Sequence, residues 1–173
     1  MLMLIRQLKD AAAPPDLKPL RAMMFYISEY PEQQHHPKED SLLFEPLRRH
    51  GGDLGGTLDE LESQHHQGEA LVHQMEHLLI RYEFLGQPAH PPLLEAMTRY
   101  ADFYFRHMRI EEEIVLPAAQ RLLTAEEWAA TDSEFTANRD PLEASQPGDD
   151  FGKLFSLIVN IAPAPVGLGD AMR

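Results

Sequence analysis

Cysteine is absent from this chain of 173 residues, which excludes disulfides, zinc ribbons, iron–sulfur clusters and thiol catalysis. Any metal site must therefore use histidine and carboxylate ligands. Long hydrophobic runs are also missing, since no apolar segment approaches the roughly 20 residues of a membrane-spanning helix. The apolar part of the N-terminal MLMLIRQLKD is too short for the core of a signal peptide. These absences predict a cytoplasmic protein that does not enter a membrane.

Positive charge is scarce as well. Asp and Glu total 28 against 15 Lys and Arg, and the formal net charge is −13. A broad basic surface is therefore not expected, so nucleic acid and anionic membranes are not predicted partners. The length suits one compact domain with a sizeable core.

Three long helical stretches, separated by glycine and proline, fill most of the chain. We expect them at about 16–49, 58–85 and 91–123. At 1.5 Å per residue each would be roughly 40–50 Å long, and short connections between such helices indicate antiparallel packing in a bundle. Only residues 1–9, about two turns, remain for a fourth helix.

The C-terminal part is less regular. We predict a helical bundle over 1–123, followed at 124–173 by an irregular helical extension packed on the same domain. Thr124 and Glu127 have the spacing of a capping box, which predicts a short helix through Phe135. The apolar stretch FGKLFSLIVNIAP predicts a further helix, with a short strand at 158–161 as the alternative.

Three His-x-x-x-Glu pairs occur, one on each long stretch. They are His35/Glu39, His65/Glu69 and His107/Glu111. A spacing of four places both side chains on one face of a helix. Nine histidines and 17 glutamates placed at random would give about one such pair. The excess predicts that the three helices bring these side chains together.

Helical phase separates these residues from their neighbours on the second and third stretches. His65 belongs to a heptad seam of apolar residues, and Glu69 lies about 60° from the centre of that seam. His66, His73 and His77 fall on the solvent side. His107 and Glu111 share an apolar face, whereas Glu112 lies off it unless a π-bulge brings it inward.

The first stretch leaves two registers open, because Pro31 and Pro37 must kink the helix or break its phase. A continuous phase favours His35 and Glu39. A slip of one residue would exchange the pair for His36 and Asp40, so His36 is the alternative ligand.

Buried histidine and glutamate need compensation, since an unpartnered group costs several kcal/mol or loses its charge. Metal ions supply it, and three imidazoles with three carboxylates suit iron, manganese or zinc. Six ligands are too many for one tetrahedral zinc and fit two ions with bridging carboxylates. The alternative is a hydrogen-bonded His–Glu network, which a single pair would favour and three pairs do not.

Three segments together resemble the hemerythrin-like HHE cation-binding family, specifically its bacterial members. They are EYPEQQHHPKEDSLLF, LDELESQHHQGEAL and FYFRHMRIEEEIVLP. The resemblance implies an all-α, up-down four-helix bundle around two non-heme iron ions with an oxo or hydroxo bridge. It implies His35, Glu39, His65, Glu69, His107 and Glu111 as metal ligands, with Glu39 and Glu111 as bridges. Residues 1–9 resemble only the end of the family's first helix, so that helix is expected to be truncated and to lack the family's further histidine. Either the chain itself is truncated, or a partner molecule such as a second copy in a homo-oligomer fills the gap.

The resemblance also implies a function. We expect a protein that binds or senses O₂, a related small molecule such as NO or peroxide, or iron. An open coordination position would lie in an apolar pocket lined by residues such as Met24, Met75, Tyr100 and Tyr104. A di-iron oxidase or peroxidase-like enzyme and a metal-stabilised interaction module are the alternatives, and no catalytic residue is assigned.

Overall fold

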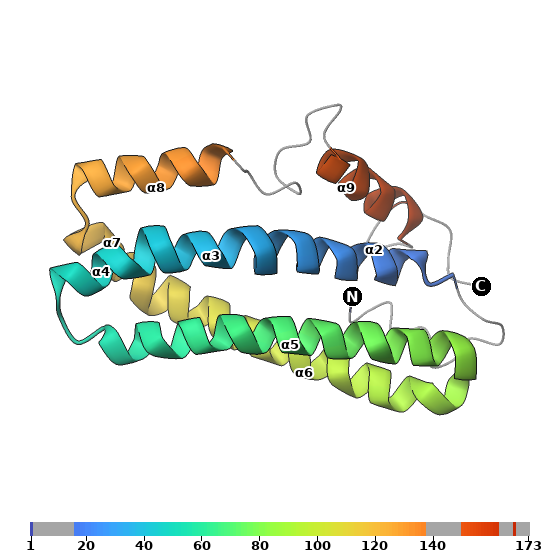
Figure 1. Ribbon diagram of the computed structural model, residues 1–173. Helices are drawn as coiled ribbons and strands as arrows, with labels where there is room; N and C mark the ends of the chain where they lie inside the picture. Colours follow the sequence, from blue (N-terminus) through green and yellow to red (C-terminus); the bar gives the residue numbers. More distant parts are fainter. Residues whose placement is uncertain (2–15, 138–149, 163–167, 169–173) are drawn as a thin grey trace.

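The computed structural model describes residues 1, 16–137, 150–162 and 168, and every regular element in them is a helix (Figure 1). The predicted all-α class is confirmed for this part of the chain, whereas the four-helix up-down order stays a prediction. The truncated helix expected at 1–9 lies, apart from Met1, outside the described residues. None of the described helices is both long enough and apolar enough to cross a membrane.

The first stretch folds as one continuous rod with two π-helical segments. Its successive parts are α2 (Lys18–Ile27), η1 (Ser28–His35), α3 (His36–Lys38), η2 (Glu39–Phe44) and α4 (Glu45–His50). Pro31 lies inside η1, and Pro46 follows η2. A proline lacks an N–H and its ring clashes with the carbonyl four residues earlier. Hydrogen bonds that span five residues, such as His36 N–H to the Pro31 carbonyl, widen the turn and accommodate the rings.

The second and third stretches form an antiparallel pair of rods in contact with each other (Figure 1). The second rod is α5 (Gly55–Leu85), and the third consists of α6 (His90–Ile110), the π-helical η4 (Glu111–Val115) and α7 (Leu116–Leu122). Gly86 and the 3₁₀ turn η3 (Gln87–Ala89) connect them. Gly86 has φ of 67°, a conformation that strains any other residue. The predicted helices therefore lie where the sequence placed them, within three residues at each end.

Two shorter helices, α8 (Ala125–Ala137) and α9 (Asp150–Ile161), lie along the first rod (Figure 1). The capping box of α8 is confirmed: the Glu127 N–H donates to Thr124 Oγ1 at 3.2 Å and the Thr124 N–H to Glu127 Oε2 at 2.9 Å. The alternative strand at 158–161 is wrong, because these residues are helical. The domain boundary at residue 123 stays a prediction.

The apolar core is divided into two clusters along the rods. One cluster packs α2 against the end of α5 and the start of α6, and contains Leu20, Met24, Met75, Leu93 and Met97. The other packs η2 and α4 against the start of α5 and against η4 and α7, and contains Phe44, Leu47, Leu58, Leu61 and Val115. The middle of each rod lies between these clusters, and the buried residues there include four polar ones from the three rods.

Candidate metal centre

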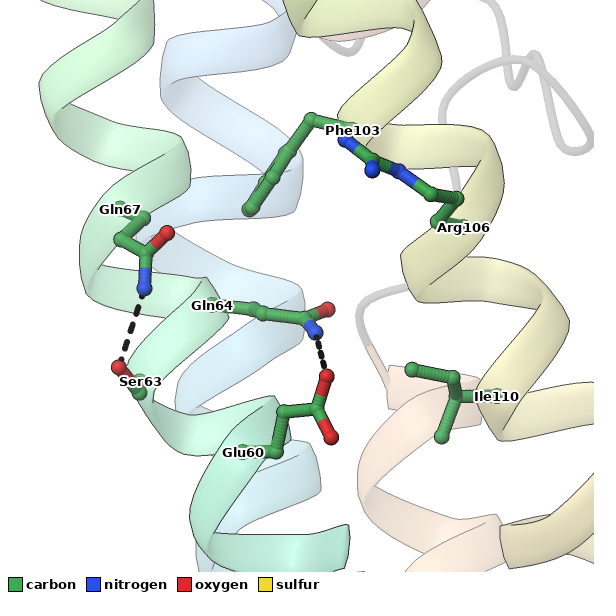
Figure 2. A pocket seen from close by; sticks show the side chains of 7 residues that line it. All are labelled: Glu60, Ser63, Gln64, Gln67, Phe103, Arg106 and Ile110. Atoms are coloured by element: carbon green, nitrogen blue, oxygen red, sulfur yellow. Dashed lines mark hydrogen bonds between the residues drawn. The ribbon is translucent and has the colours of Figure 1, made fainter.

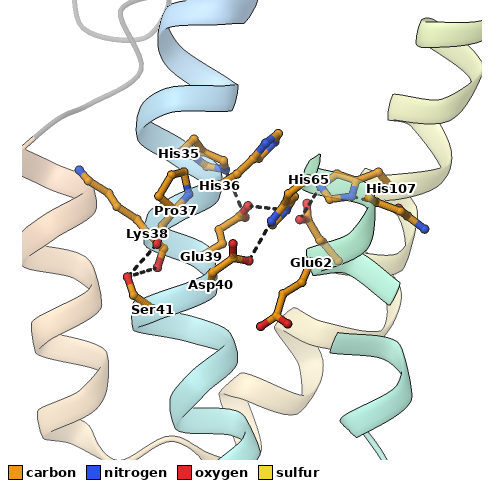
Figure 3. A network of polar contacts seen from close by, with 12 residues as sticks. His35, His36, Pro37, Lys38, Glu39, Asp40, Ser41, Glu62, His65 and His107 are labelled. Atoms are coloured by element: carbon orange, nitrogen blue, oxygen red, sulfur yellow. Dashed lines mark hydrogen bonds and ion pairs between the residues drawn. The ribbon is translucent and has the colours of Figure 1, made fainter. Parts of the chain in front are cut away.

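Four buried side chains from three rods converge in this polar layer: His36, Glu39, His65 and His107. Their potential ligand atoms all lie within 4.8 Å of one another. The imidazole ring of His65 stacks on that of His36 with centroids 4.2 Å apart, and lies 4.9 Å from that of His107. Figure 3 shows Glu39 and Asp40 reaching from the first rod towards His65. We call His36, Glu39, His65 and His107 the four-residue cluster.

A carboxylate holds the proton on the outer nitrogen of His65, which is Nδ1 and points away from the four-residue cluster. His65 Nδ1 lies 2.8 Å from Asp40 Oδ1 (Figure 3). A carboxylate only accepts hydrogen bonds, so Nδ1 carries the proton. In the neutral ring Nε2 then presents a lone pair towards Glu39, which is the tautomer that a metal ligand requires.

An amide plays the same part for His107. Gln64 Nε2 donates to Glu60 Oε1 at 2.9 Å, and this contact lies in a pocket of about 360 Å³ between α5 and α6 (Figure 2). The amide is thereby oriented with Gln64 Oε1 towards His107 Nδ1, 3.1 Å away. His107 Nδ1 donates to this oxygen, and Nε2 presents its lone pair to the interior.

The ring nitrogens of His65 and His107 that point into the centre each face a carboxylate oxygen without a hydrogen bond. His107 Nε2 lies 2.9 Å from Glu111 Oε1, and His65 Nε2 lies 3.6 Å from Glu39 Oε2. All four atoms are buried and have no hydrogen-bond partner among the described residues. Two adjacent ligand atoms of one ion, each bonded at about 2.1 Å, lie about 3.0 Å apart at octahedral angles and about 3.4 Å apart at tetrahedral angles. These spacings and the converging lone pairs therefore fit a shared cation.

The Glu39 carboxyl is suited to the anionic form that binds metals. Burial by itself raises its pKa, but the hydrogen bond from His35 and the positive charge that His35, His36 and His65 carry when protonated outweigh burial and lower it. Its two oxygens face different histidines, with Oε1 3.2 Å from His35 Nε2 and Oε2 towards His65.

The structure brings together some of the predicted ligands and not others. Glu39, His65 and His107 belong to the four-residue cluster, and Glu111 lies against His107, whereas Glu112 is exposed. Their role as ligands stays a prediction.

The expectation that Glu69 faces the core is not met, since its side chain is 64% exposed and lies near His73. Gly68, one residue earlier on the regular helix α5, takes the buried position instead.

The register of the first rod also differs from a continuous helix. His36 is buried in the four-residue cluster, while His35 lies at its rim with a side chain that is 33% exposed. The π-helical segment η1 adds about one residue to the turn before this point, which rotates His36 into the place predicted for His35. Asp40 then supports His65 from outside the cluster.

Sequence reasoning missed Glu32. Its side chain is buried, and its Oε2 lies 3.3 Å from His36 Nδ1. The spacing of four before His36 and the glycine within α5 were the available signals.

A second pocket, of about 360 Å³, opens between the candidate site and α8. We call it the α8 pocket. Glu39 and Glu111 reach it from the centre, and most of its other walls are apolar. Its lining residues are His35, Glu39, Leu43, Met108, Glu111, Glu112, Leu116, Trp128, Thr131, Asp132 and Phe135. The end of α8 is anchored there, because Lys38 Nζ donates to the Glu134 carbonyl at 2.8 Å.

Comparison with protein-family models matches residues 1–119 to the family described as the hemerythrin HHE cation binding domain. No curated protein and no solved structure matches the chain. The matched range includes the whole four-residue cluster and ends before α8.

Proposed function

Because this chain belongs to the hemerythrin HHE cation-binding domain family, we propose that its buried centre holds two non-heme iron ions and binds or senses O₂ or a related small molecule such as NO or peroxide. One observation carries the proposal. Asp40 and Gln64 fix the outer nitrogens of His65 and His107, so that both inner nitrogens face carboxylate oxygens at distances typical of shared metal ligands.

The donor set supports iron as the resident metal. Imidazole and carboxylate ligands without thiolate suit iron, manganese and zinc. Glu39 has one oxygen towards His35 and the other towards His65, as a carboxylate that bridges two ions would. Bound iron would supply reversible redox chemistry and a coordination position for a small ligand.

The α8 pocket supports access by a small molecule. Glu39 and Glu111 lie at its wall, so a molecule that enters it meets the carboxylate side of the centre. Apolar side chains such as Leu43, Met108 and Phe135 line the approach and limit the entry of ordered water.

The size of this pocket also favours a second candidate function. A volume of about 360 Å³ is within the range of sites for organic ligands and exceeds the needs of a diatomic molecule. A di-iron oxidase or peroxidase-like enzyme that acts on a small organic molecule is therefore the alternative.

The proposal is tested by anaerobic reconstitution of the full chain with Fe²⁺. Elemental analysis should find about two ions per chain, the number typical of carboxylate-bridged bundle proteins. Exposure to O₂ should then produce the absorption bands of an oxo-bridged pair. His65→Ala should lose most of the iron, whereas His73→Ala, which changes an exposed histidine on the same helix, should not.

Fewer than one ion per chain, unchanged by His65→Ala, contradicts the proposal. Continuous consumption of peroxide or of an added reductant identifies the enzyme instead.

A further inference from the structure

Glu32 is a buried carboxylate outside the three His-x-x-x-Glu pairs. Its side chain is only 6% exposed, and Oε1 has no hydrogen-bond partner in the described part of the chain. A carboxylate left in this state loses much of its solvation without full compensation. Packing alone therefore does not explain why a charged carboxylate is buried at this position.

Gly68 provides the space for this carboxylate. A Cβ atom on Gly68 would lie 3.0 Å from Glu32 Oε1 and 3.3 Å from Oε2, which is closer than ordinary contact. A glycine within a helix makes that helix less stable than an alanine would. The space that the Glu32 carboxylate needs explains why a glycine occupies this position. Gly56 on the same helix differs, since apart from its neighbours and the nearby backbone of its own helix no described atom comes within 4 Å of its Cβ position.

Two neighbours orient the carboxylate. The Tyr100 hydroxyl donates a hydrogen bond to Glu32, and burial, followed by the charge of Glu32, raises the pKa of Tyr100 far above its usual value. Tyr100 therefore stays protonated and acts as a donor. On the other side lies His36 Nδ1, 3.3 Å from Oε2, which is buried and has no hydrogen-bond partner among the described residues.

The contact between Glu32 and His36 repeats the pattern of the pairs at His65 and His107. A ring nitrogen and a carboxylate oxygen face each other at about the separation of two ligands on one ion, without a hydrogen bond. His36 also belongs to the four-residue cluster, so Glu32 adjoins the centre directly.

We propose that Glu32 is a further metal ligand, which binds one of the centre's two ions together with His36, and that Gly68 admits its carboxylate. The ion is a divalent cation that accepts oxygen and nitrogen donors. The inference rests on the proposed function, because it assigns a ligand to the same centre.

The test compares iron retention in Glu32→Gln and Gly68→Ala with that in matched controls. Glu29→Gln makes the same change in the same π-helical segment, where Glu29 accepts from Gln33. Gly56→Ala makes the same change on α5 in open space. Each apo protein is loaded anaerobically with Fe²⁺, desalted and analysed for iron, and its melting temperature is measured before loading.

The unmodified chain and both controls should retain about two ions per chain. Glu32→Gln and Gly68→Ala should each retain about one. The melting temperature of apo Glu32→Gln should equal or exceed that of the unmodified apo chain, because the change removes a buried charge. Loss of iron from a protein that folds at least as well assigns Glu32 to the metal.

Full iron retention in both Glu32→Gln and Gly68→Ala overturns this inference alone, and leaves Glu32 as a hydrogen-bond acceptor of Tyr100. Absence of iron from the unmodified chain overturns the proposed function as well. The two failures are therefore distinguishable.

Discussion

Replacing Asp40 by alanine removes the acceptor that fixes the tautomer of His65. Asp40 Oδ1 lies 2.8 Å from His65 Nδ1, and no other hydrogen bond to that nitrogen is described. Without the carboxylate the ring can place its proton on Nε2 and rotate. Each such state removes the lone pair that faces Glu39, so metal affinity should fall although no predicted ligand has been changed.

The loss of metal affinity expected for Asp40→Ala depends on how far Asp40 and His65 are exposed to water. Loss of an outer partner of a metal-bound histidine typically weakens metal binding 10–100-fold. The His65 side chain is buried, but that of Asp40 is 36% exposed, and water screens part of the contact. We therefore expect the lower end of that range, about tenfold, or about 1.4 kcal/mol.

The assay is competition between each apo protein and a chromophoric chelator for Fe²⁺ under anaerobic conditions. Asp59→Ala is the matched control, because it removes the same charge from an exposed carboxylate that pairs with Arg48 away from the centre. Asp40→Asn keeps an acceptor oxygen and should weaken binding less than Asp40→Ala. Equal affinities for Asp40→Ala and Asp59→Ala would refute the view that Asp40 sets the His65 tautomer.

Three further predictions concern ligand choice and stability. His36→Ala should lower iron retention more than His35→Ala, because His36 is in the buried cluster and His35 at its rim; elemental analysis of the two variants checks this. Thr131→Val should lower the free energy of unfolding in urea by about 1 kcal/mol, because it removes a hydroxyl whose proton is shared, at 3.0 Å each, between the Leu42 and Glu127 carbonyls. The Leu42 carbonyl lacks its usual helical donor, because position 46 is Pro46. A hydrogen bond from the Thr124 backbone, then one from His50 and one from the Thr124 side chain, lower the pKa of Glu127 from 4.5 to about 2. Its contribution to stability is therefore complete above pH 4.5 and is lost as the pH falls towards 2; unfolding measured against pH should show a shallower loss over this interval in Glu127→Gln.

The helices and part of the centre follow from local sequence features. α5 and α6 are regular, so a constant phase per residue correctly placed His65 and His107 inside and His73 at the surface. The glycines and prolines between the rods marked the helix ends because they restrict the backbone locally.

The first rod could not be predicted in the same way. Proline within it indicated a disturbance of the helix, but the number of residues added by each π-helical segment depends on tertiary packing. That number of added residues decides whether His35 or His36 faces the buried centre. The sequence kept both open, and the structure buries His36.

Glu32 and Glu69 show a second limit. Glu69 has the spacing of a ligand but lies just off the buried face of α5. Glu32 is buried because Gly68, on another rod, leaves room for it. A contact between residues 36 positions apart has no local periodicity, so a single sequence does not reveal it.

Crystallographic anomalous scattering, measured at the iron absorption edge on the iron-loaded full chain, shows whether the four-residue cluster holds iron. We expect iron peaks within bonding distance, about 2.0–2.2 Å, of ligand atoms of His36, Glu39, His65 and His107. Iron located only at exposed histidines such as His73 and His77, with none in the four-residue cluster, would contradict this expectation.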